Sequence, residues 1–148
     1  MSANKIDQML VLAGLLAMAM RTSVRGQVNP GSQSETMSTM QDIRRTTDRL
    51  LEELYRIDER VTPVRWAIAH SRDRLVNDVY RGAGDPALHV MELEGLGDVL
   101  ERDHPFLSSS DRRESVFERQ VIQRYDLFRL ALDSGRRTFS RARCWRRQ

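Results

Sequence analysis

The sequence predicts an all-α fold, a small bundle of about four helices. Apolar residues recur every three or four positions over most of the chain, which is typical of amphipathic helices. Only 8 glycines and 4 prolines occur in 148 residues, and most of them separate the apolar segments. No segment alternates apolar and polar residues between hairpin turns, as strands would. We divide the chain into an apolar segment (1–20), a linker (21–33), a helical domain (34–135) and an arginine-rich tail (136–148).

The apolar segment contains an unbroken run of apolar or small residues from Met9 to Met20. A helix of this length reaches about 18 Å, well short of the roughly 30 Å hydrocarbon core of a membrane. The run has the length of a secretory signal, and a cut after Ala19 would follow small residues. Asp7 and the single Lys5 fit a signal poorly. Two interpretations therefore stay open: a signal or membrane-surface anchor, or a helix that packs in the domain or binds a partner.

Localisation depends on this choice. The protein is exported or membrane-associated if residues 1–19 are a signal or an anchor, and otherwise cytoplasmic or nuclear. Residues 21–33 include Gly26, Pro30 and Gly31 and lack apolar periodicity, so they are interpreted as a flexible linker.

The first predicted helix begins between Ser34 and Ser38, where Ser38 to Gln41 fits a capping box. From Met40 to Val61 the apolar positions follow alternating steps of three and four, which make three heptads. We call these positions the heptad seam: Met40, Ile43, Thr47, Leu50, Leu54, Ile57 and Val61. The seam is a candidate partner-binding site if it forms a coiled-coil oligomer. The alternative is that it packs inside the chain's own bundle.

Two further helices follow, each opened by a capping residue and a proline. Thr62-Pro63 starts a helix that ends at Gly82-Ala83-Gly84, and Asp85-Pro86 starts one that runs to about Arg102. The predicted core side of the former carries Val64, Ile68, Leu75 and Val79. That of the latter carries Leu88, Met91, Leu96, Val99 and Leu100.

A loop over residues 103–110 leads to a fourth predicted helix, which begins near Asp111 and ends at Gly135. Glycine is common just after the last turn of a helix. The predicted core face of this helix carries Phe117, Val121, Tyr125, Phe128 and Leu132.

The tail is basic and contains no acidic residue. Arginine pairs with phosphate, and aromatic rings stack on bases or lie at a lipid interface. The tail therefore predicts a nucleic-acid site, a site for an anionic membrane or an acidic protein surface, or simply a solvated end. The candidate residues are Arg136, Arg137, Arg141, Arg143, Trp145, Arg146 and Arg147.

The sequence offers no recognisable catalytic or metal-binding motif. Its three histidines, His70, His89 and His104, do not form an HExxH motif, and Cys144 is the only cysteine. The nucleophile elbow and the glycine-rich phosphate loops are also missing from the sequence. We therefore expect no enzyme, no metal and no cofactor.

These features predict a non-enzymatic helical interaction or assembly protein that binds itself or a protein partner through amphipathic helices. The alternative is a nucleic-acid-binding regulatory protein, for example a viral or phage one, that uses the arginine-rich tail.

Overall fold

The described chain consists of helices joined by short connections. The computed structural model describes residues 30–57, 59–108 and 116–146. These ranges contain no strand, which confirms the predicted all-α bundle. The predicted segment 1–20, most of the linker and the expected helix start near Asp111 lie outside them. The elements are α2 (Pro30–Leu54), η1 (Glu59–Val61), α3 (Thr62–Arg81), α4 (Pro86–Asp103), η2 (Pro105–Leu107) and α5 (Val116–Arg146).

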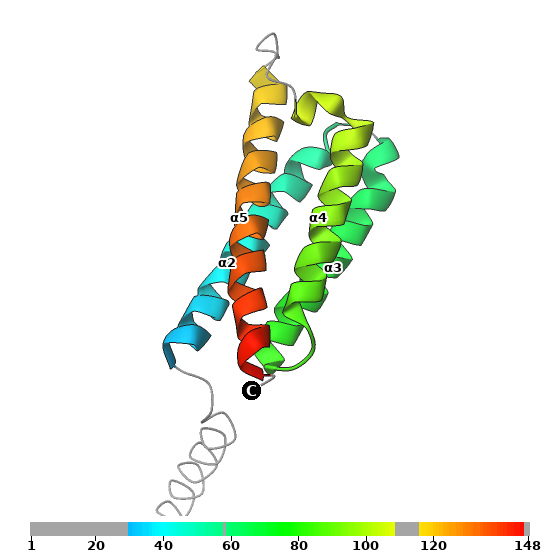
Figure 1. The fold of residues 1–148 in the computed structure, drawn as a ribbon. Helices are drawn as coiled ribbons and strands as arrows, with labels where there is room; N and C mark the ends of the chain where they lie inside the picture. Colours follow the sequence, from blue (N-terminus) through cyan, green and yellow to red (C-terminus); the bar gives the residue numbers. More distant parts are fainter. Residues whose placement is uncertain (1–29, 58, 109–115, 147–148) are drawn as a thin grey trace, which may run out of the picture. The chain divides into compact units, whose positions relative to one another are not determined.

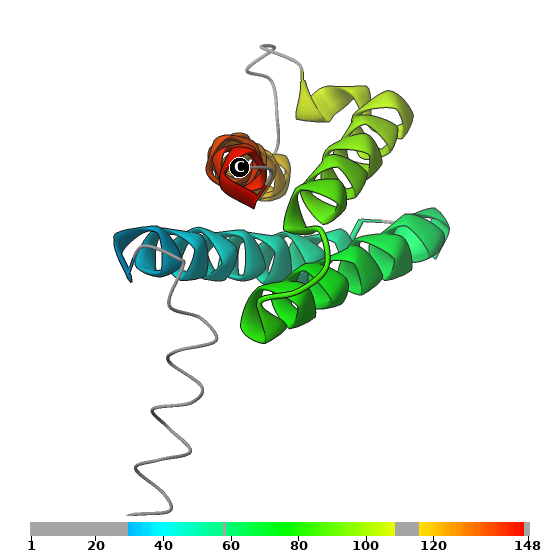
Figure 2. The same ribbon diagram turned by 60° about the horizontal axis from the view of Figure 1, so that its bottom comes forward.

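Residues 34–148 belong to one compact unit, in which successive helices alternate in direction (Figure 1). Helices α3 and α4 lie side by side and antiparallel, and α5 returns along α4. Helix α2 crosses them obliquely, as Figure 2 shows. It contacts α5 through Thr39 and Thr138, and α3 through Asp48 and Arg72.

The core lies where the inward faces of the four helices meet. Five residues of the heptad seam lie on α2, and all five are at most 1% exposed. Thr47 is tolerated there because its hydroxyl donates a 2.5 Å hydrogen bond to the Ile43 carbonyl of the preceding turn. The other fully buried large residues are Ile68, Leu75, Val90, Leu93, Leu100, Val121, Phe128 and Leu132.

The predicted helix is not continuous over the whole seam, because α2 ends at Leu54. Ile57 lies half-buried in the following turn, and Val61 is buried in η1. Pro63 is incompatible with one helix through this region, because its ring would clash with the carbonyl four residues earlier. The heptad spacing therefore predicts that these residues face the core, but it does not predict one continuous helix. The last two seam residues lie in the turn and in η1, beyond the end of α2.

Helix α3 ends as predicted, at a glycine in the left-handed conformation. Gly82 has φ +62°, and its N–H donates to the Val79 carbonyl. The next N–H, from Ala83, donates to the Asp78 carbonyl at 3.2 Å. This pair of bonds is a Schellman motif, which satisfies carbonyls at the helix end.

The predicted core face of α4 is partly wrong. Leu88 and Met91 are 44% and 58% exposed, whereas Leu100 is buried as expected. Val90 and Leu93 are fully buried in their place, and His89 and Gly97 also face inward. Because α4 lies between α3 and α5, the residues that face these two helices are buried, whether they are large, small or polar.

Helix α5 does not end at Gly135 as expected but continues to Arg146. Gly135 is buried inside the helix, where a Cβ atom would clash with Ile43 and lie in contact with Val90. Thr138 and Phe139, from the predicted tail, are also buried. The glycine therefore serves a close helix contact, and Thr138 and Phe139 of the predicted tail belong to the core.

Candidate partner-binding surface

The heptad seam is not on the surface of this unit. Its residues from Met40 to Leu54, and Val61, are at most 2% exposed within the single chain. A partner would reach them only if the helices separated, so any surface that binds without unfolding lies elsewhere.

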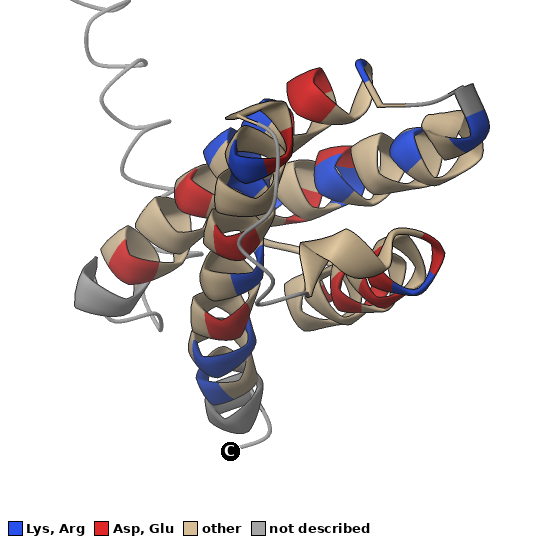
Figure 3. Ribbon diagram, turned by 90° about the horizontal axis from the view of Figure 1, so that it is seen from above, with Lys and Arg blue, Asp and Glu red and all other residues tan. Residues whose placement is uncertain are grey.

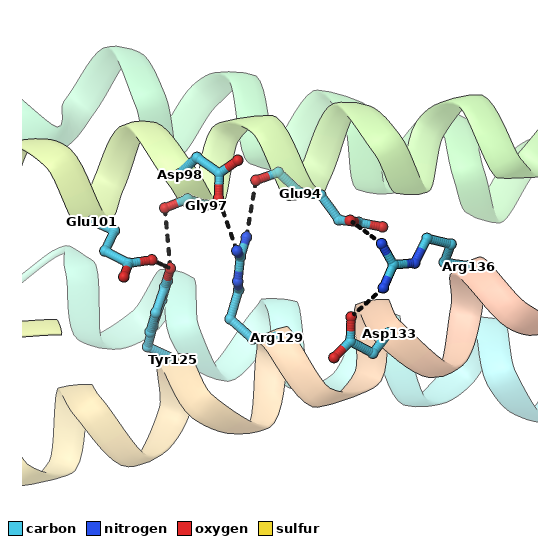
Figure 4. A network of polar contacts seen from close by, with 8 residues as sticks. All are labelled: Glu94, Gly97, Asp98, Glu101, Tyr125, Arg129, Asp133 and Arg136. Atoms are coloured by element: carbon cyan, nitrogen blue, oxygen red, sulfur yellow. Dashed lines mark hydrogen bonds and ion pairs between the residues drawn. The ribbon is translucent and has the colours of Figure 1, made fainter. Parts of the chain in front are cut away.

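The side of α5 that faces α4 is occupied by a polar network (Figure 4). Arg129 donates from Nη1 to the Glu94 carbonyl at 3.0 Å and from Nη2 to Asp98 Oδ1 at 2.8 Å. The Tyr125 hydroxyl lies 2.7 Å from Glu101 Oε2 and 3.2 Å from the Gly97 carbonyl, and its single hydrogen serves these two acceptors. These contacts fix α5 against α4.

Burial raises the pKa of the Tyr125 phenol above its usual value, and the hydrogen bond to Glu101 raises it further. Burial also raises the pKa of Asp126, and the neighbouring charge of Glu101 adds to this. Both pKa shifts favour the protonated form, chiefly because of burial, and Glu101 of α4 adds to each.

Arg136, which the sequence places with the tail, joins the same network. Its guanidinium lies 3.7 Å from Glu94 Oε2 and 3.1 Å from Asp133 Oδ1 (Figure 4). Arg137 and Arg141 are also exposed, but neither makes an ion pair within the described residues. The side chains of Arg143, Trp145, Arg146 and Arg147 lie outside those described.

A second polar cluster, which the sequence did not suggest, joins α3 to α4. His89 is 4% exposed, with Nε2 2.7 Å from Asp78 Oδ2 and Nδ1 3.4 Å from Glu92 Oε2. The Ser71 hydroxyl also donates to Glu92 Oε2, at 3.1 Å. The only signal in the sequence was the spacing of His89 and Glu92, three residues apart on one helix.

Burial acts to raise the pKa of Glu92, but the groups around it outweigh this effect. Hydrogen bonds from His89 and Ser71 and the nearby charge of Arg74 bring the pKa below its usual value. The cluster lies between α3 and α4, where its hydrogen bonds satisfy polar groups that packing removes from water.

Two shallow hollows lie on either side of α2. The hollow toward α3 mixes charges, since Arg72 pairs there with both Asp48 and Asp73. The hollow toward α5 has basic, hydroxyl and apolar lining residues and no carboxylate: Arg45, Thr46, Arg49, Arg124 and Leu127. Charges of both signs are otherwise interspersed along the helices (Figure 3).

The outward face of α5 continues from the second hollow. Leu127 is 39% exposed and Leu130 is 63% exposed. The steps from Leu127 to Leu130, Ser134, Arg137 and Arg141 are three, four, three and four, so these residues share one side of the helix. We call this set the outer α5 face.

The described residues contain no group of three His, Cys, Asp or Glu side chains that could hold a metal ion. Among the helices for which the structure gives positions, none is long and apolar enough to cross a membrane. A comparison of the chain with protein-family models, curated proteins and solved structures finds no match. Within the described residues, four α-helices carry shallow, charged hollows and exposed apolar side chains, among them Leu127 and Leu130 on α5 and Leu88 and Met91 on α4.

Proposed function

We propose that this protein is a non-enzymatic helical interaction module, and that the outer α5 face binds a protein partner. The observation that carries the proposal is the contrast between the two apolar stripes. The heptad seam is buried in the core of the single chain, whereas Leu127 and Leu130 lie on the surface. Exposed apolar side chains on one helix face, rimmed by charge, are typical of interaction sites.

The proposal leaves α5 itself in place. The sides of α5 that do not belong to the outer face pack against the core and contact α4 through Arg129 and Arg136. A partner would therefore meet a helix that is already ordered, which lowers the entropy cost of binding.

Site-specific photocrosslinking tests the proposal. A benzophenone amino acid replaces Leu130 in one variant and Leu88, an exposed leucine on α4, in a matched control. Both are expressed in the native host and irradiated. We expect adducts with a defined second protein, or with a second copy of the chain, from position 130 and not from 88.

Equal adducts from both positions, or none from position 130, would contradict the proposal. So would an adduct joining position 130 only to residues 9–20 of the same molecule, because the face would then be covered by the chain itself.

Nucleic-acid binding is the second candidate, and the extension of α5 to Arg146 favours it. Arg137 and Arg141 lie about one turn apart on this helix, both exposed. Guanidinium groups at this spacing could contact successive phosphates, and the affinity should then fall steeply with salt.

Substitution is a better test of this candidate than deletion of residues 136–148, which would remove Phe139 from the core. Labelled 20-nucleotide RNA and DNA are titrated at 50 and 200 mM salt with the R137Q/R141Q variant and with R44Q as control. Salt-sensitive binding that only the double variant loses would support this candidate. No binding at 50 mM would exclude it.

A further inference from the structure

We propose that the hollow between α2 and α5, together with Leu127 and Leu130, binds an acidic amphipathic helix of the partner. This inference rests on the proposed function and specifies the chemistry of the partner. The hollow is lined by Arg45, Arg49 and Arg124 and by no carboxylate-bearing residue.

Two of the three arginines that line the hollow are not neutralised by any carboxylate that the structure describes. Arg45 pairs with Asp42 at 2.5 Å, but Arg49 and Arg124 form no ion pair with any residue that the structure describes. In contrast, Arg129 and Arg136 each contact a carboxylate. The positive charge of Arg49 and Arg124 is therefore available to a ligand.

The arrangement also has a cost that an anion would relieve. Arg45 and Arg49 are four residues apart on α2, so their guanidinium groups lie on the same side of the helix. Like charges at this spacing destabilise a helix, and the ion pair of Arg45 with Asp42 offsets only part of this repulsion. Arg124 adds a third positive charge from α5. Bound carboxylates would turn this repulsion into attraction.

The apolar residues favour a peptide over a nucleic-acid backbone. Leu127 lines the hollow, and Leu130 lies about 4.5 Å further along α5. Phosphates and sugars offer little apolar surface to cover two leucines. An acidic amphipathic helix offers apolar side chains at spacings of three and four, with carboxylates beside them, which matches this surface.

Thr46 does not alter this preference. Its hydroxyl donates within α2, lying 2.8 Å from the Asp42 carbonyl and 3.1 Å from the Ile43 carbonyl. The donors left for a ligand are therefore guanidinium groups, whose forked N–H groups match carboxylates.

Fluorescence anisotropy with designed 20-residue helical peptides tests the inference on the full chain. One peptide carries Leu on one side and Glu on the flanks. A second has Lys for every Glu, a third has Ser for every Leu, and a 20-nucleotide RNA is the fourth probe. The proteins are wild type, R49Q/R124Q and the control R44Q, which removes an exposed arginine from the other side of α2.

We expect the Glu–Leu peptide to bind wild type and R44Q equally and R49Q/R124Q about tenfold more weakly. The Lys and Ser peptides should bind at least tenfold more weakly than the Glu–Leu peptide. Circular dichroism and thermal unfolding of each variant show whether it is folded.

Three results would overturn the inference. The Glu–Leu peptide does not bind, it binds R49Q/R124Q as tightly as wild type, or RNA is the only probe whose binding needs Arg49 and Arg124. Photocrosslinks from position 130 would still stand in those cases if the proposed function is right. Their loss, with peptide binding intact, would instead contradict the proposed function alone.

Discussion

Gly135 of α5 packs directly against Ile43 of α2. A Cβ atom on Gly135 would lie 2.6 Å from Ile43 Cδ1 and 3.4 Å from Val90 Cγ2 of α4. Three helices therefore approach one another at a position that has no side chain. This contact explains why α5 continues through a glycine that the sequence suggests as its end.

Gly135→Ala should lower the free energy of unfolding by about 1–3 kcal/mol, because overpacking outweighs the better helix propensity of alanine. Gly95→Ala on α4 is the matched control, since nothing lies within 4 Å of a Cβ there. It should stabilise by about 0.5–1 kcal/mol. Urea unfolding measures both. Stabilisation by Gly135→Ala equal to that of the control would show that the helices are not in close contact.

Tyr125→Phe should lower the free energy of unfolding at pH 7 by about 1–2 kcal/mol, because the hydroxyl bond to Glu101 is lost. The pKa of Tyr125 is raised in the folded state, so the wild-type contribution is complete below the usual pKa of 10 and is lost as the pH rises above it. The difference in the free energy of unfolding between wild type and variant should therefore become smaller above pH 10. A difference that stays constant up to pH 11 would contradict this arrangement.

Glu92→Gln should lower the free energy of unfolding at pH 7 by about 1 kcal/mol, because the contacts with His89 and Ser71 favour the carboxylate. The pKa of Glu92 is lowered on folding, so this contribution is present above the usual value of 4.5 and disappears as the pH falls further. Chemical unfolding at pH 7 and at pH 3 measures the change. The exposed Glu52→Gln is the control, and an equal effect at both positions would contradict the cluster.

Leu50→Ala, in the heptad seam, should lower the free energy of unfolding by about 2–5 kcal/mol, because the side chain is fully buried. Leu130→Ala, on the outer α5 face, should change it by less than about 0.5 kcal/mol. Thermal unfolding of the two variants compares them directly. A larger loss of stability for Leu130→Ala than for Leu50→Ala would mean that the outer α5 face is buried and the heptad seam is exposed.

The pattern of apolar residues predicted the α-helical class and most of the core. The periodicity was strong on α2 and α5, where Leu50, Leu54, Phe128 and Leu132 fill the interior as expected. The proline and glycine signals around α3 also located its two ends.

The sequence could not reveal which residues meet between helices. His89 and Gly97 are buried on α4 because of what α3 and α5 place opposite them, and periodicity carries no such information. The sequence could not predict the basic hollow for the same reason, because Arg49 and Arg124 are far apart along the chain. The composition of the tail predicted a set of arginines available to a ligand. The structure shows that one of them, Arg136, is paired with acidic residues of the same chain.

A designed disulfide between α2 and α5 tests the central claim, which is that the seam is buried within a single chain. The hydroxyl oxygens of Thr39 and Thr138 lie 3.3 Å apart, so cysteines at these positions should be close enough to join. We would oxidise the T39C/T138C/C144S variant at low protein concentration and measure the mass under non-reducing conditions. The structure predicts a monomer with an intrachain bridge. A covalent dimer linked through these positions would contradict it.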